Sequence, residues 1–152
     1  MGQTFAEKVL AKKSGQSKVV PGQICVVKPD HLLSHDNTAA IVSKIKDDLD
    51  EFGVANPDLP VVIFDHITPA ASEKTATNHQ VARNYAKKHN LPHFYDVGNG
   101  VCHQVLMEKG LALPGTIVVG SDSHTCSYGA LNVFSSGIDR TEAAALLLTG
   151  QT

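Results

Sequence analysis

The sequence contains few of the residues that form cross-links or stack on nucleobases. Its 152 residues include three cysteines, no tryptophan and 5% aromatic residues, and the formal net charge is −2. An odd, sparse set of cysteines without a Cys-x-x-Cys pair argues against a disulfide framework and indicates a reducing compartment. Nucleic-acid binding is also disfavoured, because phosphate contacts need basic residues in excess and base stacking needs aromatic residues.

Long apolar runs are missing as well. No stretch approaches the roughly 18 apolar residues that cross a bilayer, and the first residues lack the basic and apolar regions of a secretory signal. We therefore expect a cytoplasmic protein with neither a membrane nor a nucleic acid as partner. With 42% hydrophobic and 18% charged residues, the composition predicts one globular domain over residues 1–152.

Hydrophobic periodicity predicts alternating strands and helices, hence an α/β fold in three layers (α/β/α) with a mainly parallel sheet. Strands are expected at residues 24–28, 61–64, 93–97 and 116–119. Helices are expected from Thr4 to Gly15, from a cap at Asp36 or Asn37 to Gly53, at 72–89, at 101–109, and from a cap at Asp139 to Gly150.

Two of these helices have a predicted buried face. It comprises Ile41, Ile45, Leu49 and Phe52 in one, and Val81, Ala82, Tyr85 and Ala86 in the other. The last helix, with its Ala143–Leu148 run, is apolar on most faces. We expect this helix to leave an apolar face that needs a partner, and the chain to continue beyond Thr152.

Two apolar runs end in ionisable residues. Asp65 and His66 follow residues 61–64, and Asp122, Ser123 and His124 follow residues 117–120. Ligands bind beyond the carboxyl ends of the strands in open α/β sheets, so these residues are the first candidates for an active site.

Each group has a functional and a structural interpretation. An Asp next to a His can fix its tautomer and raise its basicity, whereas an Asx-turn with an incidental histidine explains Asp65 and His66 equally well. Asp122, Ser123 and His124 could serve as a carboxylate near a metal-bound water, a hydroxyl on a substrate carboxylate, and an acid or base. The structural alternative is a helix-capping turn.

Two further histidines lie in polar segments. His103 follows the glycine-rich residues 98–102, where a ligand can approach the backbone closely, although a helix-surface histidine is the simpler interpretation. His35 precedes Asp36 and Asn37; helix capping explains those two, so only His35 requires a functional role. The other histidines, His31, His79, His89 and His93, are expected on the surface or in loops. Cys126 is expected to be a small packed residue.

Four segments, taken together, resemble the aconitase superfamily. They are residues 33–38 (LSHDNT), 64–66 (FDH), 98–104 (GNGVCHQ) and 120–125 (GSDSHT), in the family's order and over nearly the whole chain. Residues 123–130 (SHTCSYGA) resemble the branch of isopropylmalate dehydratase and homoaconitase large subunits. His35, where aconitases usually carry Gln, favours the same branch.

The resemblance implies a hydro-lyase of leucine biosynthesis or a related pathway, acting on a hydroxy di- or tricarboxylate with a [4Fe–4S] cluster as Lewis acid. Asp65 and His66 would assist departure of the hydroxyl. His103 and His124 would order the iron-bound water and the substrate, and Asp122 would hydrogen-bond that water. Ser123 would bind a substrate carboxylate, and His35 would line the substrate pocket.

The same resemblance implies that this chain is the N-terminal part of a larger large subunit. The family's cluster cysteines lie further along, and none of Cys25, Cys102 and Cys126 matches them, so no metal ligand is expected in this chain. The substrate-binding arginines and the catalytic base serine also lie on later or separate segments. We therefore expect the remainder of the large subunit and a small swivelling subunit as partners, and no activity from these residues by themselves.

Two other functions remain open at the level of the sequence. Asp65, His66, Asp122 and His124 also suit Zn²⁺ or Mn²⁺, so a metal-dependent hydrolase is one alternative. A non-catalytic domain that keeps the aconitase-like fold is the other.

Overall fold

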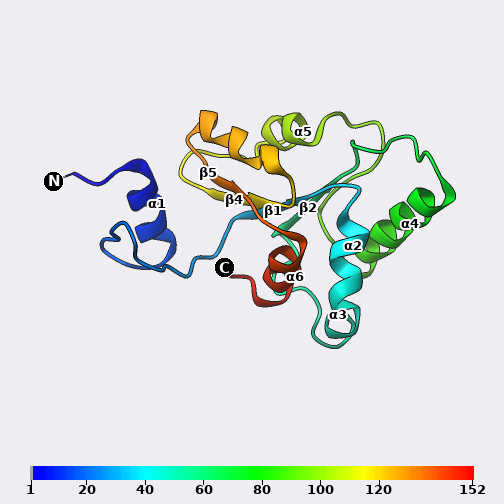
Figure 1. The fold of residues 1–152 in the computed structure, drawn as a ribbon, viewed down its shortest axis with the longest axis horizontal. Coiled ribbons are helices and arrows are strands. Elements are labelled where there is room, and N and C mark those ends of the chain that lie inside the picture. The colour runs from blue at the N-terminus through cyan, green and yellow to red at the C-terminus, as the bar shows by residue number, and fades with distance from the viewer. Residues whose placement is uncertain (1) are drawn as a thin grey trace.

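A computed structural model describes residues 2–152 and contains a five-stranded parallel sheet in the order β3-β2-β1-β4-β5 (Figure 1). The strands are β1 (His31–Ser34), β2 (Pro60–Ile63), β3 (His93–Tyr95), β4 (Ile117–Gly120) and β5 (Phe134–Gly137). The α-helices are α1 (Phe5–Lys13), α2 (Thr38–Val42), α3 (Lys46–Phe52), α4 (Glu73–Lys88), α5 (Cys102–Glu108) and α6 (Arg140–Thr149). Two 3₁₀ helices, η1 (Ser43–Ile45) and η2 (Ser123–Leu131), complete the fold. The predicted α/β class is confirmed.

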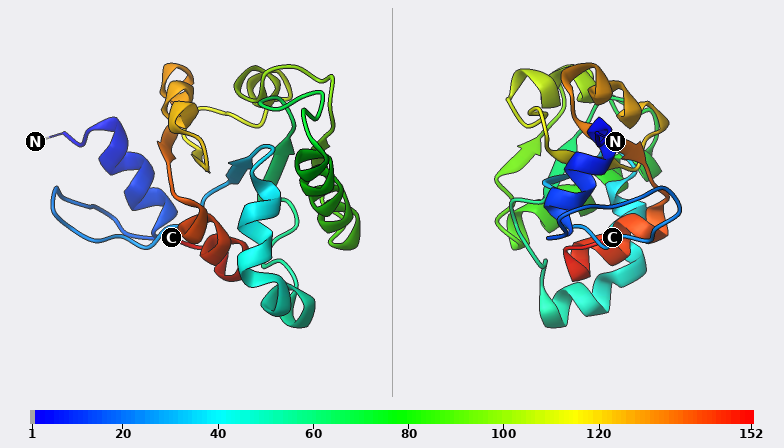
Figure 2. Two further views of the ribbon diagram at one scale, coloured as in Figure 1. Left: turned by 45° about the vertical axis from the view of Figure 1, so that its right-hand side comes forward. Right: turned by 90° about the vertical axis from the view of Figure 1, so that its left-hand side faces the viewer.

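Helices cover both faces of the sheet. Successive side chains of a strand point in opposite directions, so each apolar strand has apolar side chains to bury on both faces. Val62 and Phe64 pack with α2, α4 and α6, whereas Val61 and Ile63 pack with α5 and η2. Figures 1 and 2 show α5 and η2 on one side of the sheet and α2, α3 and α6 on the other. Both faces of the central strands are therefore buried, as their continuous apolar runs indicate.

The strand order reverses at β1, which lies between β2 and β4. Leu33 is paired with Val61 on one side and with Gly120 on the other. The loops after β2 and β4 therefore leave the same edge of the sheet on either side of the loop after β1. Such a switch point is where open α/β sheets bind ligands.

Two strands lie where the sequence did not predict them, and one predicted strand is absent. Residues 24–28 are not a strand; Val27 instead exchanges two backbone hydrogen bonds with Thr152, of 2.8 and 3.0 Å. The strand in this region is β1, which starts only after Pro29, a residue with no N–H to offer a sheet. The other missed strand, β5, is an edge strand with half-buried and exposed residues, so it carries no apolar run.

The helix predicted to end at Gly53 is three short segments, α2, η1 and α3. The Ser43 hydroxyl donates to the Ala39 carbonyl oxygen at 2.6 Å, and the tighter 3₁₀ turn follows. This turn rotates the apolar stripe, so that Phe52 is 72% exposed and was wrongly placed in the core. In α4, Val81 is 36% exposed, because the buried positions recur at His79, Ala82 and Ala86.

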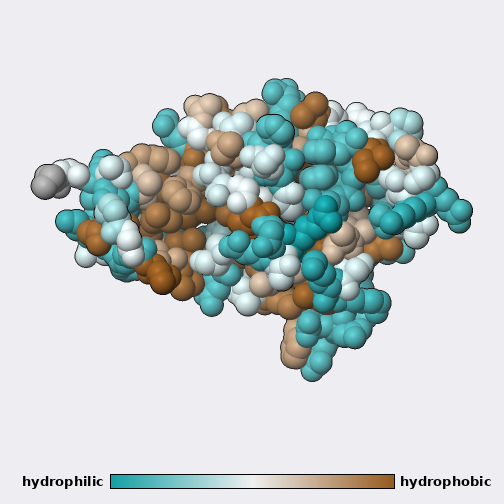
Figure 3. All heavy atoms as spheres, viewed as in Figure 1, coloured by the Kyte–Doolittle hydropathy of each residue, from teal (hydrophilic) through white to brown (hydrophobic). Residues whose placement is uncertain are grey.

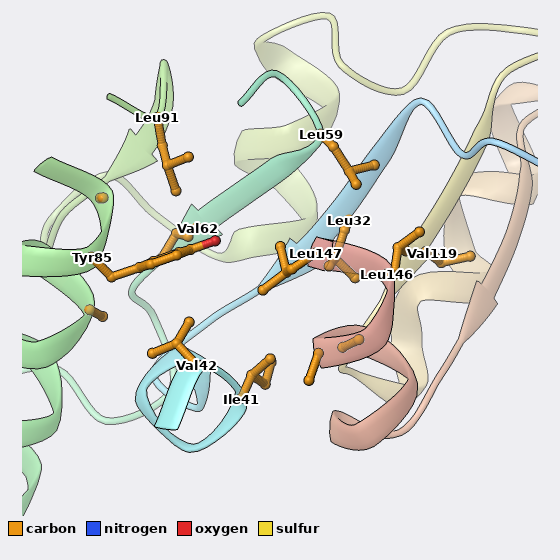
Figure 4. Packing of buried hydrophobic residues seen from close by; sticks show 14 of the residues in the cluster. Leu32, Ile41, Val42, Leu59, Val62, Tyr85, Leu91, Val119, Leu146 and Leu147 are labelled. Carbon is orange, nitrogen blue, oxygen red and sulfur yellow. The ribbon is translucent and has the colours of Figure 1, made fainter. Parts of the chain in front are cut away.

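The last helix, α6, buries its large apolar side chains within the chain itself. Leu146 and Leu147 are 0% and 3% exposed, and Figure 4 shows them facing Leu32 and Val119 of the sheet. Only Leu148 is half-exposed, so the prediction of a large uncovered apolar face on this helix was wrong. The predicted caps are present, since Asp139 accepts hydrogen bonds at the start and Gly150 ends the helix with a φ of 69°.

Exposed apolar side chains gather instead in the N-terminal arm, residues 14–28, which lies beside α1. Ile24 is 93% exposed and Val26 57% (Figure 3). Lys13 at the end of α1 forms an ion pair of 2.5 Å with Asp30, just before β1. Among residues 2–152, no helix has the length and apolar character needed to cross a membrane.

Candidate active site

The predicted site residues meet at the carboxyl edge of the sheet. His35 follows β1, Asp65 and His66 follow β2, and the Asp122–His124 segment follows β4. His103 lies in the first turn of α5. Ser123 begins η2 beside them and is exposed. The topology thus brings together residues that are up to 89 positions apart, as the expectation from the strand ends required.

Asp65 and His66 interact directly, because the chain leaves the strand after Phe64. The Asp65 Oδ1 atom lies 2.6 Å from His66 Nδ1, and Asp65 Oδ2 accepts the Cys102 N–H at 2.6 Å. Asp65 therefore orients the His66 ring and joins β2 to the start of α5. Burial opposes the charged imidazolium, but the hydrogen bond that His66 donates to Asp65 and the charges of Asp65 and Asp122 outweigh it and raise the pKa of His66.

Asp122 joins two sets of site residues, Asp65 with His66 and His103 with His124. Its Oδ1 accepts the His124 N–H at 2.7 Å, which caps η2, and lies 2.8 Å from His103 Nε2. Its Oδ2 lies 3.4 Å from His66 Nε2, so Asp122 connects the two sets. Burial opposes ionisation, but the hydrogen bonds from His124 and His103 lower the pKa of Asp122 and keep it a carboxylate.

The ionised Asp122 determines the tautomer of His103. A carboxylate can only accept, so His103 Nε2 carries the proton and donates to Asp122. In the neutral form of this ring, the other nitrogen, Nδ1, is the acceptor for the Tyr128 hydroxyl, 2.8 Å away. Tyr128 is fully buried, and burial raises its pKa, so its O–H keeps the proton. The sequence analysis did not identify Tyr128 as a site residue, because the mixed polar and apolar residues of η2 give no helix or strand pattern.

His35 lies against His66 as a stacked ring. The two ring centroids are 3.8 Å apart and the planes differ by 19°. Burial and the neighbouring His66 lower the pKa of His35, so this imidazole is the neutral member of the pair. Its Nδ1 atom is buried without a hydrogen-bond partner among the described residues. The His35 side chain is 13% exposed, and its role in substrate binding stays a prediction.

Asp36 and His79 were assigned wrongly from the sequence. Asp36 does not cap a helix: it accepts the N–H groups of Asp65 and His66 and pairs with His79. His79 is 2% exposed, although it was expected on the surface. Asn37 occupies the N-cap of α2 without a capping bond and instead donates to the Ser121 carbonyl at 3.1 Å. The sequence held one signal for His79, its helical spacing with Ala82 and Ala86.

The remaining histidines and cysteines lie away from this network or are unsuited to it. His31 and His93 are half-buried strand residues with rings 5.4 Å apart, rather than loop residues. His89, at the C-cap of α4, is also half-buried. Cys126 is exposed, contrary to the prediction that it is packed. Cys102 is buried, and burial raises the pKa of its thiol.

The donor atoms that could hold a metal ion form two groups in residues 2–152. One contains His35, Asp36, Asp65 and His66, and the other contains His103, Asp122 and His124. The four residues considered for Zn²⁺ or Mn²⁺ are thus divided between the groups. Neither group includes a cysteine, so neither supplies the thiolate ligands that a [4Fe–4S] cluster requires.

Fold and site together define an α/β domain of Rossmann-like strand order with a carboxylate–imidazole cluster at its switch point. The sequence profile of the aconitase family (aconitate hydratase) matches residues 7–152. The chain therefore belongs to the aconitase family, as its four motifs predict.

Three curated relatives show which members of the family this chain resembles. The chain is 44% identical over 151 residues to 3-isopropylmalate dehydratase large subunit 1 of Methanopyrus kandleri. It is 43% identical to the probable large subunit of Methanothermobacter thermautotrophicus and 42% identical to that of Herpetosiphon aurantiacus. These alignments cover 99–100% of this chain but 36% of each relative, so the chain spans about a third of their length.

Proposed function

We propose that this chain forms one wall of the active site of a hydro-lyase, as part of a 3-isopropylmalate dehydratase-type large subunit. Such an enzyme removes water from a hydroxy di- or tricarboxylate and adds it back at the neighbouring carbon. The observation that supports this most is the continuous set of contacts from Asp65 through His66 and Asp122 to His103. It places an imidazole with a raised pKa next to a carboxylate at the strand ends.

In this proposal His66 is the acid that protonates the departing hydroxyl. Its raised pKa favours the charged ring, and Asp65 at Nδ1 and Asp122 at Nε2 flank the ring. After protonation the hydroxyl leaves as water, and the neutral His66 recovers a proton when the product is rehydrated. The base that takes the carbon-bound proton lies outside this chain.

Four further residues would position the substrate. His124 is 79% exposed at its side chain, and with Ser123 it lies on the open side of the network. We assign a substrate carboxylate to Ser123, a place in the lining of the substrate pocket to His35, and the orientation of substrate and water to His103 and His124. Members of this family are iron–sulfur enzymes; the cluster would be held by residues outside this chain and would act there as the Lewis acid. Because the relatives are named large subunits, we infer a small-subunit partner.

The test uses the complete large subunit that carries this chain, together with its small subunit. Purified enzyme is supplied with isopropylmalate, homocitrate or citrate, and the unsaturated product is followed by its ultraviolet absorbance. His66→Gln should lower kcat on the order of 10²- to 10⁴-fold, the usual contribution of a general acid. His89→Gln, which changes a half-buried histidine remote from the site, should leave the rate unchanged.

Three outcomes would contradict the proposal. The first is a full rate in the His66→Gln enzyme. The second is an enzyme that hydrates none of these acids but hydrolyses esters in the presence of Zn²⁺ or Mn²⁺, which would support the metal-dependent hydrolase. Failure of both activities in a folded, cluster-loaded enzyme would support the non-catalytic domain.

A further inference from the structure

A buried hydrogen-bonded pair, Asp36 and His79, lies next to the loop that carries the proposed acid. The Asp36 Oδ1 and His79 Nε2 atoms are 2.6 Å apart, and each side chain is 3% exposed. Asp36 follows β1, whereas His79 comes from the middle of α4, so the pair joins the sheet to the helix layer. The His79 ring also stacks on Phe64, with centroids 4.4 Å apart and an angle of 21°.

The second oxygen of Asp36 holds the backbone that carries Asp65 and His66. Phe64 N–H still donates to the Tyr95 carbonyl in the sheet. The next two N–H groups, those of Asp65 and His66, both donate to Asp36 Oδ2, at 3.2 and 2.8 Å. The position of the His66 ring therefore depends on where this one carboxylate lies.

The contacts of Asp36 leave it little capacity for a ligand. Three donors occupy its two oxygens, and burial opposes its charge, yet the hydrogen bonds from His66, His79 and Asp65 lower its pKa. Since the carboxylate only accepts, His79 must donate from Nε2. A buried carboxylate without this donor would be drawn towards solvent, and the two backbone N–H groups would move with it.

We propose that Asp36 and His79 are a positioning pair that sets the orientation of His66 toward the substrate. Neither residue touches the reacting atoms. Both act through the backbone of the loop after β2. This inference rests on the proposed hydro-lyase function and on the assignment of His66 as its acid.

Two substitutions of His79 separate the hydrogen bond from the packing. His79→Phe keeps a ring that can stack on Phe64 but removes the Nε2 donor. His79→Gln keeps an N–H donor at a similar reach but removes the ring. If the pair positions His66, His79→Phe should lower kcat on the order of 10- to 100-fold, the usual effect of losing a supporting hydrogen bond. KM should change little, and His79→Gln should recover most of the loss.

The measurement is steady-state kinetics of the complete enzyme with its small subunit. A purely structural role for His79 predicts the reverse order, with the Phe variant near wild type and the Gln variant impaired. That order, or a change confined to KM, would overturn the proposal. If the Phe variant does not fold, His79→Met replaces it, since this flexible side chain also lacks a donor but fills the space.

His66→Gln is measured in parallel to separate the two proposals. Loss of activity in His66→Gln with a normal rate in His79→Phe would refute the positioning pair and leave the proposed function intact. Normal activity in His66→Gln, or a wild-type enzyme without hydro-lyase activity, would refute the proposed function first.

Discussion

Gly120, the last residue of β4, tests how tightly the turn that carries Asp122 is packed. A Cβ at this position would lie 2.4 Å from Thr125 Oγ1 and 3.1 Å from Leu33 Cβ. Thr125 is 0% exposed, and its hydroxyl donates to the Asp122 carbonyl oxygen at 2.7 Å. Gly120→Ala must therefore rotate Thr125, which breaks this hydrogen bond, and also press β4 against Leu33 of β1.

The expected cost follows from these two contacts. Overpacking of this kind costs about 1–3 kcal/mol, and a lost hydrogen bond adds about 1 kcal/mol. Together they give about 2–4 kcal/mol, a fall in Tm of roughly 4–16 °C for a chain of this size. Unfolding in urea and by heat, followed by circular dichroism, would measure both quantities.

A matched control and a double variant make this prediction specific. Gly129 lies exposed in η2 with no atom within 4 Å of an added Cβ, so Gly129→Ala should be neutral or stabilise by up to about 1 kcal/mol. Thr125→Ala removes the nearest atom, so Gly120→Ala should cost less in that background, with a coupling of about 1–2 kcal/mol. Equal stability of the two single glycine variants, or strict additivity with Thr125→Ala, would refute the reasoning.

The other predictions concern the site and the cysteines. Tyr128→Phe removes the hydroxyl that contacts His103 Nδ1 and should lower the free energy of unfolding in urea by about 1–2 kcal/mol. In the complete enzyme it should lower kcat on the order of 10-fold, and an unchanged rate would argue against a role for this His103 tautomer. Because the folded pKa of His66 is raised, the stability from its charge is fully present below the unfolded value of about 6.5 and is lost as the pH rises through the folded pKa. Unfolding measured against pH should show this loss in wild type and not in His66→Gln, and identical profiles would contradict it. Anaerobic treatment of residues 1–152 with iron and sulfide should give no stable cluster, because no cysteine joins either donor group; a stoichiometric cluster by absorbance would show that assignment to be wrong.

The sequence predicted best the elements whose pattern lies in consecutive residues. The apolar β-branched runs at residues 61–64 and 116–119 predicted the two strands whose ends carry the site, and the strand edges differ by one residue. Capping residues placed α1 and α6, and apolar spacing placed α4, within one or two residues of their ends. The weak signals came from two short strands. β1 is mostly buried, but only two of its four residues, Leu32 and Leu33, are apolar, and β5 is an edge strand of half-buried and exposed residues that needs no apolar run.

The role of Asp36 and His79 could not be read from the sequence. An Asp before a helix is usually a cap, since capping needs only the N–H groups of the next few residues. Here the partners of Asp36 are 29, 30 and 43 positions away, at the end of another strand and in another helix. No local pattern records such a pairing.

The sequence by itself determined the α/β class, the family and the types of residue at the strand ends, because these depend on local spacing and on motifs that persist in order along the chain. The tertiary structure alone decided how those residues act on one another. Parallel pairing on both sides of β1 brings Asp65, His66 and Asp122 within hydrogen-bond or ion-pair distance. Proximity of that kind fixes which carboxylate is charged and which imidazole nitrogen holds a proton, since both depend on the few ångströms around each group.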